Sequence, residues 1–588
     1  MRRLHAIGLT LLTAFPALGS DRPNVVGVIT DDQGWGDFGF HGNRTVRTPN
    51  LDQLARESAR VESFYVSPVC APTRAALMTG RWTQRTRAID TYIGRAMMDP
   101  EEITIAEALG DSGYATGIFG KWHLGDCYPM RPQDQGFQES LVHRGGGIGQ
   151  PSDPEGGEGK YTDPVLFENG ERRELRGYCT DIYFDSAVEF MGRAAEAGRP
   201  FFAYIATNAP HGPFHDVPEG LLEEYRNTDL SPAAFPVTEG GHALPEKNDE
   251  NKLSRIFAMI TNIDEGFGRM TRALKELGIA DDTIVIYMLD NGPNTRRYVG
   301  GMRGMKSDVH EGGVRSPLWI RWPARLEAGR TTDRVAAHVD VMPTLLDACG
   351  VDRSEGNRLD GRSLLPLLEG EGVTDWPDRD LVIQAHRGDR AVRYHHFLLR
   401  NQRWKLLNAS GFGKELEEVE PSFELYDMAA DPLEKNNLAS SEPEVLAELV
   451  ARYDAWFDDV SSTRPDNYAP PRIALGADEA PETHLTRQDW RRVSKDRGWA
   501  RTSLGYWEVD VRSAGPYAIR VRFPGNSEVT SVKLRCGELE ISRTCKPEDS
   551  DLLLEGLELQ VGPGRMEVEL ASGDGTLFGA HQVIVTRL

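Results

Sequence analysis

Continuous apolar runs alternate with helical patterns along the first two thirds of the chain. Runs that are apolar at every position are typical of strands buried on both faces of a parallel sheet. Between them, apolar residues recur at three- and four-residue intervals, as they do in helices packed on such a sheet. The pattern predicts an α/β fold with a mostly parallel central sheet flanked by helices. Strands are expected at 24–30, 114–120, 200–207, 282–289 and 318–322, and helices at 51–59, 103–112, 180–194 and 253–277.

The pattern changes twice in the remaining third. Short strands at 381–384, 394–400 and 404–408 precede a helix at 443–457, which suggests a small separate sheet. After residue 499 the polarity alternates with period two between Gly-, Pro- and Asn-containing turns, which favours an antiparallel β-sandwich. Such a domain binds glycan or buttresses the rest, and the lack of an evident aromatic cluster favours the buttress. The expected divisions are 1–20, 21–375, 376–460, a linker at 461–498, and 499–588.

Charged or titratable residues follow four of the predicted buried strands. In open α/β sheets, ligands bind beyond the carboxyl ends of the strands. The acids Asp31 and Asp32 follow one strand, and Asp290 with Asn291 follows another. These four oxygen donors suit Ca²⁺ or Mg²⁺ and are poor ligands for Zn²⁺. The two adjacent acids, taken alone, are better explained by a solvated turn than by a cation site. Lys121 and His123 follow a third strand, and His211 follows a fourth.

A cysteine stands where a helix is expected to begin. Cys70 is followed by Pro72, a residue suited to the first helical position, and by the helix formers 75–78. A helix N-terminus favours bound anions, and Arg74 adds a positive charge within one turn. A nucleophile beside an anion site suits attack on a sulfate or phosphate ester. The alternative is a buried cysteine with a purely structural role.

Several motifs in one order carry a family resemblance. Cys70-Ala-Pro-Thr-Arg74 is followed by Thr79-Gly-Arg81, then by the segment Gly-Lys-Trp-His-Leu-Gly at 120–125, and later by 303–317, which contains Lys306. Together these motifs resemble the type I, formylglycine-dependent sulfatases, over about residues 22–460. The resemblance implies an alkaline-phosphatase-like fold, with 376–460 as its small C-terminal antiparallel subdomain. It also implies that a formylglycine-generating enzyme oxidises Cys70 to formylglycine.

The resemblance also implies a role for each candidate residue. Ca²⁺, or else Mg²⁺, is expected to be held by side chains at the ends of two strands together with the modified residue 70. Three basic residues are expected to balance the charge of the sulfate. One histidine is expected to protonate the departing alcohol and the other to accept a proton from the second hydroxyl of the hydrated formylglycine. The metal ligands are Asp31, Asp32, Cys70, Asp290 and Asn291; the bases are Arg74, Lys121 and Lys306; the histidines are His211 and His123, in that order.

The resemblance therefore predicts a sulfatase, and two alternatives stay open. A phosphodiesterase or phosphonate monoester hydrolase of the same superfamily has a similar site. A catalytically inactive glycan-binding protein is the third reading, against which the intact Cys70 and the complete set of metal ligands argue. The net charge of −23 argues against nucleic acid and anionic membranes as partners.

The first 20 residues indicate where the substrate lies. A basic start, a short apolar run and a small-residue end at 17–19 are typical of a secretory signal peptide. A secreted or periplasmic location makes a sulfated carbohydrate the expected substrate. The long irregular segment 141–170 is expected to reach the rim of its pocket, and a mobile loop without a role in the pocket is the alternative. Export permits disulfides, and among the six cysteines Cys536 and Cys545 are expected on neighbouring strands as a possible pair.

Overall fold

The computed structural model describes residues 22–588 with several short gaps. The omitted segments are 353–355, 371–375, 386, 389, 413–419, 494–497, 525–527 and 547. The signal peptide expected at 1–20 lies outside the described residues. Among the helices that are described, none combines the length and the apolar character needed to cross a membrane.

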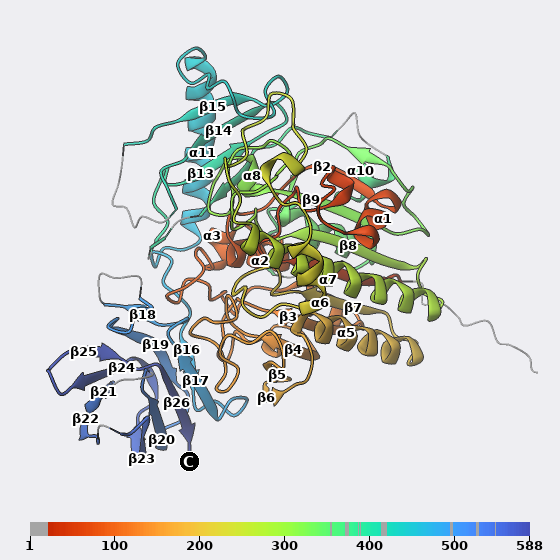
Figure 1. The fold of residues 1–588 in the computed structure, drawn as a ribbon. Coiled ribbons are helices and arrows are strands. Elements are labelled where there is room, and N and C mark those ends of the chain that lie inside the picture. The colour runs from red at the N-terminus through yellow and green to blue at the C-terminus, as the bar shows by residue number, and fades with distance from the viewer. Residues whose placement is uncertain are drawn as a thin grey trace, which may run out of the picture.

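One large, mostly parallel sheet forms the centre of the molecule (Figure 1). Its strand order is β10-β2-β9-β8-β1-β7-β3-β4-β5-β6, with β11 also paired to β2. The inner strands β8, β1, β7, β3 and β4 are all parallel, whereas β9 runs antiparallel to both of its neighbours. The bounds are β1 Asn24–Thr30, β2 Ala59–Tyr65, β3 Ala115–Lys121, β4 Glu139–His143, β5 Val165–Glu168, β6 Glu171–Glu174, β7 Phe201–Ala206, β8 Thr283–Leu289, β9 Arg315–Arg321, β10 Thr331–Thr332 and β11 Ala336–Ala337.

Helices cover both faces of this sheet, as the apolar runs predicted. Strands β3, β7 and β8 are buried at every position, so each supplies apolar side chains to the two cores at once. One core packs α1, α5, α6 and α7 against the sheet, and the other packs α2, α4, α9 and α10. The bounds are α1 Pro49–Glu57, α2 Cys70–Thr79, α3 Thr83–Thr86, α4 Ile105–Asp111, α5 Cys179–Glu196, α6 Glu219–Arg226, α7 Glu250–Glu276, α8 Glu311–Val314, α9 Val341–Ala348 and α10 Leu365–Glu369.

A small antiparallel sheet follows, with strand order β12-β13-β14-β15. Helix α11 packs its apolar side chains, Leu449, Tyr453 and Phe457 among them, on one face of this sheet. The other face lies over Tyr65 and Ala76 of the large domain. The bounds are β12 Leu381–Gln384, β13 Phe397–Arg400, β14 Trp404–Asn408, β15 Glu424–Asp427 and α11 Pro443–Ser462.

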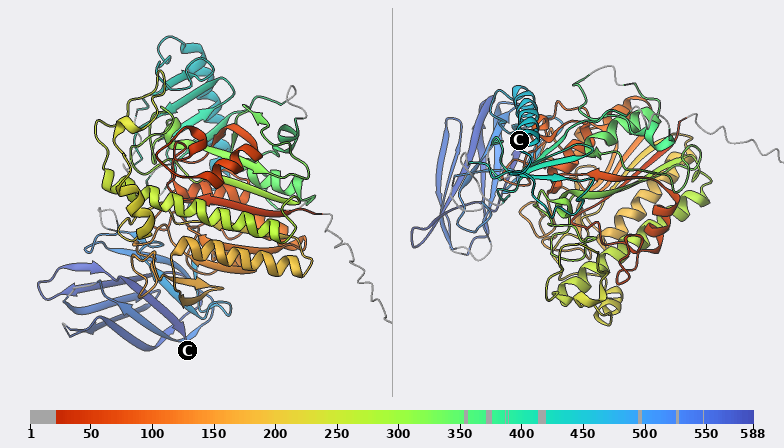
Figure 2. Two further views of the ribbon diagram at one scale, coloured as in Figure 1. Left: turned by 45° about the vertical axis from the view of Figure 1, so that its right-hand side comes forward. Right: turned by 90° about the horizontal axis from the view of Figure 1, so that it is seen from above.

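Two further sheets form a β-sandwich at one end of the molecule, drawn in blue in Figure 2. It begins earlier than the sequence suggested. Residues 473–492 were expected to belong to a linker, but β16 pairs with β19, β17 pairs with β26, and β18 pairs with β19. The bounds are β16 Ile473–Leu475, β17 Glu482–Thr486, β18 Arg491–Arg492, β19 Gly505–Val511, β20 Gly515–Arg522, β21 Val529–Cys536, β22 Leu539–Thr544, β23 Asp551–Leu559, β24 Gly562–Ser572, β25 Leu577–Gly579 and β26 Gln582–Arg587.

The sandwich shares its core with the large domain. Its apolar interior is continuous with five side chains from the segments that precede and follow α4 and β3. These are Tyr92, Ile93, Met97, Cys127 and Met130. The sandwich is therefore packed onto the large domain and is not joined to it by a linker alone.

The register of one hairpin excludes the pairing of Cys536 with Cys545. Cys536 lies opposite Leu539 beside the turn, whereas the N–H of Cys545 bonds to Thr530 O at the far end of the hairpin. The six-residue step from 530 to 536 spans about 20 Å at strand spacing. A disulfide needs Cα atoms within about 7 Å. Both thiols are free.

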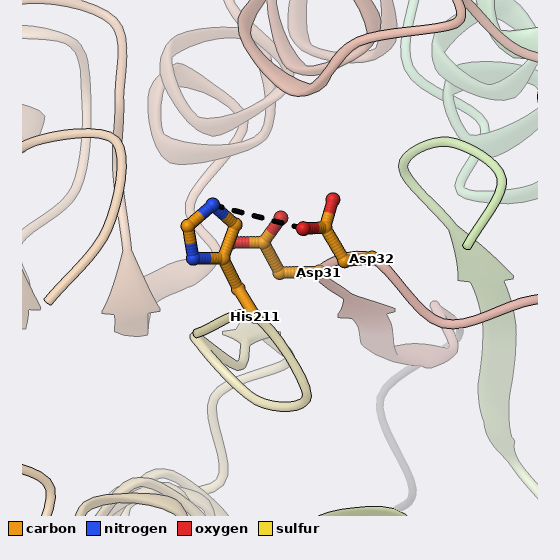
Figure 3. A group of neighbouring side chains, drawn as sticks. All are labelled: Asp31, Asp32 and His211. Carbon is orange, nitrogen blue, oxygen red and sulfur yellow. Dashed lines mark ion pairs between the residues drawn. The ribbon is translucent and has the colours of Figure 1, made fainter. Parts of the chain in front are cut away.

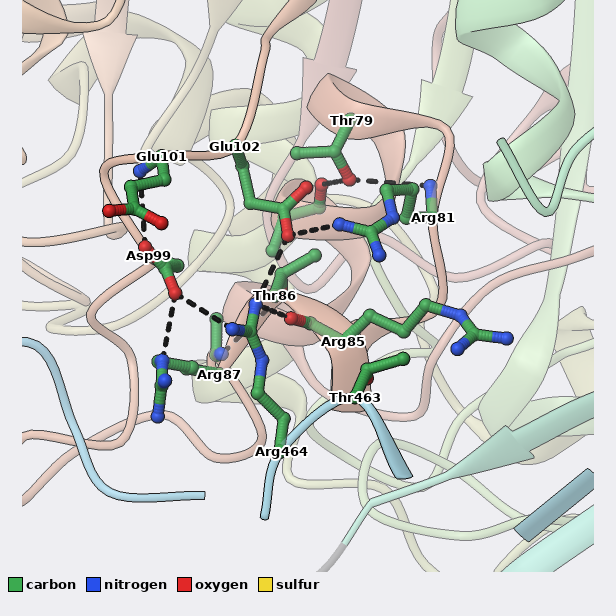
Figure 4. A network of polar contacts seen from close by, with 12 residues as sticks. Thr79, Arg81, Arg85, Thr86, Arg87, Asp99, Glu101, Glu102, Thr463 and Arg464 are labelled. Atoms are coloured by element: carbon green, nitrogen blue, oxygen red, sulfur yellow. Dashed lines mark hydrogen bonds and ion pairs between the residues drawn. The ribbon is translucent and has the colours of Figure 1, made fainter. Parts of the chain in front are cut away.

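A buried network of ion pairs braces the segment that follows α2 (Figure 4). Arg464, just after α11, pairs with Asp99 at 2.9 Å and with Glu102 at 3.1 Å. Arg87 pairs with Asp99 at 2.8 Å, and Arg81 also pairs with Glu102. Residues 87–99 therefore form a loop whose two ends are held together by charge-assisted hydrogen bonds.

Buried histidines make the stability of this fold sensitive to acid. Burial lowers the pKa of His338 from 6.5 to about 3. The unfolded chain takes up this proton below about pH 6.5, whereas the folded chain remains neutral there, so acid favours unfolding. We expect the melting temperature to fall by several degrees as the pH is lowered from 6.5 to 4. The His338→Gln variant should show a shallower fall in a thermal scan.

Candidate active site

The four polar strand ends predicted from the sequence meet at one edge of the central sheet. Because β1 lies between β7 and β8, the chain turns that follow these strands are adjacent. The N–H of Asp290 bonds to Thr30 O at 3.1 Å, and the N–H of Asp31 bonds to Ala209 O at 3.3 Å. Lys121 is the last residue of β3, which is next to β7. Parallel strand order thus brings together residues that are up to 260 positions apart.

Helix α2 places Cys70 at this same edge. The sequence suggested that Pro72 is the first residue of the helix. The helix instead begins at Cys70, so Pro72 is its third residue. It ends at Gly80, whose left-handed φ of +65° accommodates the closing N–H bond to Ala76 O. Cys70 is 3% exposed. Its Sγ and one carboxylate oxygen each of Asp31 and Asp290 lie within 4.8 Å of one another.

Asp31, Asp32, Asp290 and Asn291 form a buried cradle of oxygen atoms, and two of these oxygens accept no hydrogen bond from the described residues. Among the described residues, Asp31 Oδ1 and Asn291 Oδ1 are buried and have no hydrogen-bond partner. A buried oxygen without a partner is costly, and a cation ligated by both oxygens would satisfy them. Burial, followed by the charge of Asp31, raises the pKa of Asp290 to about 6 even though Arg74 opposes the shift. The donor set therefore fits a hard divalent ion such as Ca²⁺.

Each of the three basic residues pairs with one acid of the cradle. Arg74 donates to Asp290 Oδ2 from Nε at 3.2 Å and from Nη2 at 2.9 Å, and its Nη1 donates to Lys121 O at 3.1 Å. Lys121 Nζ lies 2.7 Å from Asp31 Oδ2, and Lys306 Nζ lies 2.5 Å from Asp32 Oδ1. Burial alone would raise the pKa of Asp32, but the charge of Lys306 and then that of His211 bring it well below its usual range. All three acids thus have a positive neighbour in place.

His211 faces the two aspartates (Figure 3). Its Nε2 lies 3.7 Å from Asp32 Oδ2, and its Nδ1 contacts Gly212 O at 2.7 Å. The Nδ1 proton is therefore donated to the backbone, which directs Nε2 to the site. Burial lowers the pKa of His211 to about 4, although Asp32 opposes the shift. The side chain is 17% exposed, more than Asp31 or Asp32, which places it toward the open side of the site.

His123 is buried and is hydrogen-bonded through only one of its two ring nitrogens among the described residues. Its Nε2 contacts the carbonyl oxygen of Thr91 at 2.8 Å, and its Nδ1 is buried without a hydrogen-bond partner among the described residues. Because a carbonyl only accepts, the proton lies on Nε2 and Nδ1 keeps its lone pair. Burial and then the charge of Lys121 lower the pKa of His123 well below its usual value. His123 has a left-handed backbone φ of +63°. This conformation costs conformational energy in residues other than glycine, and such strained residues cluster at functional sites.

Two adjacent glycines, Gly146 and Gly147, let the backbone approach both histidines. A Cβ atom at Gly146 would lie 2.7 Å from His123 Nε2, and one at Gly147 would lie 2.7 Å from His211 Cε1. Larger side chains therefore do not fit here. These glycines follow β4 and belong to the segment 141–170, so this segment reaches the two histidines.

The sequence reasoning missed Thr91, Gly146 and Gly147. Thr91 acts through its backbone carbonyl, which no side-chain pattern reveals. The Gly145–Gly147 run was visible, but it gave no indication of the strand end that it contacts. The burial of Cys70 adds a constraint, because burial, opposed by Lys121, raises the pKa of its thiol. An unmodified thiol in this position stays protonated and is a weak nucleophile.

Comparisons with known proteins agree with this geometry. The family model described as Sulfatase matches residues 23–351, and the model described as N-sulphoglucosamine sulphohydrolase, C-terminal, matches residues 305–456. Arylsulfatase A of Homo sapiens is 31% identical and aligns with 73% of this chain and 86% of its own length. N-acetylgalactosamine-6-sulfatase of Canis lupus familiaris is 28% identical, over 76% of this chain and 88% of that protein.

The fold also has solved relatives. The crystal structure of Ps i-CgsB in complex with k-i-k-neocarrahexaose superposes with a TM-score of 0.63 at 25% identity. The match covers 77% of this chain and 95% of that one. Both family models end before the β-sandwich, which begins at residue 473.

Proposed function

The chain belongs to the sulfatase family, and from this premise we propose that it hydrolyses a sulfate ester on a sulfated carbohydrate, using formylglycine made from Cys70 and a bound Ca²⁺ ion. One observation carries the proposal. Cys70, three acids and three bases from five segments of the chain meet at one edge of the sheet. Among the described residues, Asp31 Oδ1 and the neighbouring Asn291 Oδ1 are buried there without partners. Such a cluster suits a small anion held between a cation and fixed positive charges.

Two groups would complete this site. Asp31, Asp32, Asp290 and Asn291 would hold the metal ion, together with residue 70, and the ion supplies positive charge opposite the sulfate oxygens. Formylglycine at position 70 would supply, as its aldehyde hydrate, a hydroxyl nucleophile toward sulfur and a second hydroxyl that can give up a proton when sulfate is released.

The basic residues divide into two kinds. Lys121 and Lys306 each place an ammonium group beside a carboxylate at the edge of the cradle, where a sulfate oxygen gains a charge-assisted hydrogen bond. Arg74 donates two hydrogen bonds to Asp290 and one to Lys121 O, so it orients that carboxylate and adds positive charge to the site. In this arrangement the positive charge is in place before substrate binds, which is what stabilises charge developing on the leaving oxygen.

The two histidines take opposite roles. His211 donates its Nδ1 proton to Gly212 O, which leaves Nε2 to hold the proton that passes to the departing alcohol oxygen. The negative charge of a bound sulfate favours the protonated form of this ring. His123 has its proton on Nε2, bonded to Thr91 O, so its unpartnered Nδ1 takes up a proton during sulfate release.

Three observations support a carbohydrate substrate: the names of the relatives, the proposed export of the protein and the position of segment 141–170 beside the site. The N-acetylgalactosamine-6-sulfatase relative is named for a sugar sulfate, and the structure of Ps i-CgsB contains k-i-k-neocarrahexaose. The proposed signal peptide, outside the described residues, assigns the protein to the periplasm or the exterior, after maturation by a formylglycine-generating enzyme. The segment 141–170, which reaches both histidines, is the part of the rim that would contact the sugar ring.

A panel of defined sulfated sugars tests the proposal. We expect sulfate release, measured by ion chromatography, from at least one sulfated oligosaccharide with a higher kcat/KM than from an aryl sulfate. An aryl phosphodiester should be turned over at least about 100-fold more slowly, since the site is proposed to favour sulfate esters. Activity confined to aryl or alkyl sulfates would contradict the carbohydrate assignment, and faster turnover of the phosphodiester would contradict the sulfatase assignment.

A further inference from the structure

The β-sandwich, which lies outside the matched family models, donates a hydrogen bond beside the proposed active site. Gln488 lies between β17 and β18. Its Nε2 donates to the carbonyl oxygen of Thr91 at 2.8 Å. The same oxygen accepts the Nε2 proton of His123, also at 2.8 Å. A side chain 365 positions beyond His123 therefore shares its hydrogen-bond acceptor.

Gln488 is held firmly in this position. Gln488 is 1% exposed, and its backbone carbonyl oxygen accepts a hydrogen bond from the N–H of Gly94 at 3.0 Å. Asp489 Oδ2 accepts the N–H of Asp126 at 3.0 Å, and Arg491 Nη1 donates to Ile93 O at 2.8 Å. The segment 486–491 is thus hydrogen-bonded to the chain before His123, at residues 91–94, and after it, at Asp126.

The support beneath this segment is rigid. Trp507 Nε1 donates to Thr486 O at 2.7 Å, and both Trp490 and Trp507 are fully buried. Tyr92 and Ile93, which directly follow Thr91, belong to the hydrophobic core of the sandwich. The position of Thr91 O is therefore set jointly by the sandwich and by the ion-paired loop 87–99.

We propose that Gln488 is a positioning residue for His123. The carbonyl of Thr91 has two lone pairs, and the bond from Gln488 occupies one so that the other points at His123. This fixes the imidazole in the tautomer with the proton on Nε2 and aims the lone pair of Nδ1, as partners behind a functional histidine commonly do. The inference rests on the role proposed above for His123, and it gives the sandwich a function beyond buttressing.

The Gln488→Met variant is the first test. Methionine keeps the volume of the side chain but cannot donate, and Gln488 Oε1 has no partner to lose among the described residues. We expect kcat to fall about tenfold, as for other groups that orient a functional histidine, while KM for an aryl sulfate changes by less than about twofold. The melting temperature should stay within a few degrees of the wild type.

Arg491→Met is the matched control. It removes a bond from the same segment to the same loop, but to Ile93 O and not to Thr91 O. It should lower the melting temperature and leave kcat close to that of the wild type. If Arg491→Met and Gln488→Met reduce kcat equally, general docking of the sandwich explains the effect and the proposal is wrong.

Gln488→Glu gives a readout that a purely structural role would not produce. An ionised carboxylate cannot donate to Thr91 O, whereas a protonated one can. The activity of this variant, relative to the wild type at each pH, should therefore rise as the pH is lowered. A constant ratio would overturn the proposal, and this pH series decides the question if the methionine variant is recovered unfolded.

A double-mutant cycle separates this inference from the proposed function. If Gln488 acts through His123, then adding Gln488→Met to a His123→Asn variant should cost almost no further activity. Full additivity would refute the positioning role. A His123→Asn variant with unchanged kcat would instead refute the role proposed for His123, whereas a slow His123→Asn and an unaffected Gln488→Met would refute this inference alone.

Discussion

Replacing Cys70 with alanine should lower kcat for an aryl sulfate by at least about 1,000-fold, because it removes the group from which the nucleophile is made. The fold should survive the change. Cys70 opens a helix whose remaining residues are all buried by their neighbours, and alanine is the best helix former. The loss of one sulfur atom from a site 3% exposed leaves only a small cavity. Circular dichroism and the melting temperature should therefore remain close to those of the wild type.

Cys179→Ala is the matched control for this substitution. Cys179 is also a buried cysteine, and it is also the first residue of a helix, α5, but it lies outside the acid cluster. This variant should keep its kcat and lose at most some stability. Comparable turnover by the Cys70→Ala variant would show that the nucleophile lies elsewhere.

Removing divalent cations should abolish most of the activity, and Ca²⁺ should restore it. In the absence of the ion, Asp31, Asp32 and Asp290 repel one another, and two buried oxygens lack partners. Binding to the folded state alone also stabilises it, so Ca²⁺ should raise the melting temperature of the chelated protein. Asp290→Asn should lower kcat by about 100-fold or more, since a ligand charge is lost. The same variant should show little calcium-dependent shift.

Asp37→Asn provides the comparison for the metal site. Asp37 is a buried carboxylate near the same strand end, but its partner is Arg297, at 2.7 Å, and it is not part of the acid cluster. Its loss should lower stability while the calcium-dependent rise in melting temperature persists. Full activity of the wild type after chelation, with metal content verified by elemental analysis, would contradict the metal assignment.

Much of the large domain could be predicted because its strands are buried on both faces. Continuous apolar runs identified β1, β7 and β8 to within a residue or two, and their polar ends were expected to converge because parallel strands share one edge. The arrangement of Asp31, Asp32, Asp290 and Asn291 follows from that rule. The pairing of each acid with one base depends on side-chain packing, which strand order does not specify.

The sequence predicted short strands and largely exposed strands less well. Strand β16 has three residues and β17 begins with an exposed glutamate, so neither forms a run long enough to separate from a linker. Strand β22 has no buried residue at all and left no apolar pattern. Without its position, the distance from Cys536 to Cys545 could not be judged. The contact between Gln488 and Thr91 joins a surface domain to a backbone atom, and tertiary packing alone creates it.

The central claim is that turnover depends on the conversion of Cys70. The most direct test varies the converted fraction by expressing the protein with different amounts of a formylglycine-generating enzyme. Peptide mass spectrometry then measures the aldehyde and the thiol at position 70 in each preparation, and the same preparations are assayed for sulfate release. Specific activity should rise in proportion to the aldehyde fraction and extrapolate to zero when only the thiol is present. Undiminished activity in a preparation that contains only the thiol would contradict the account.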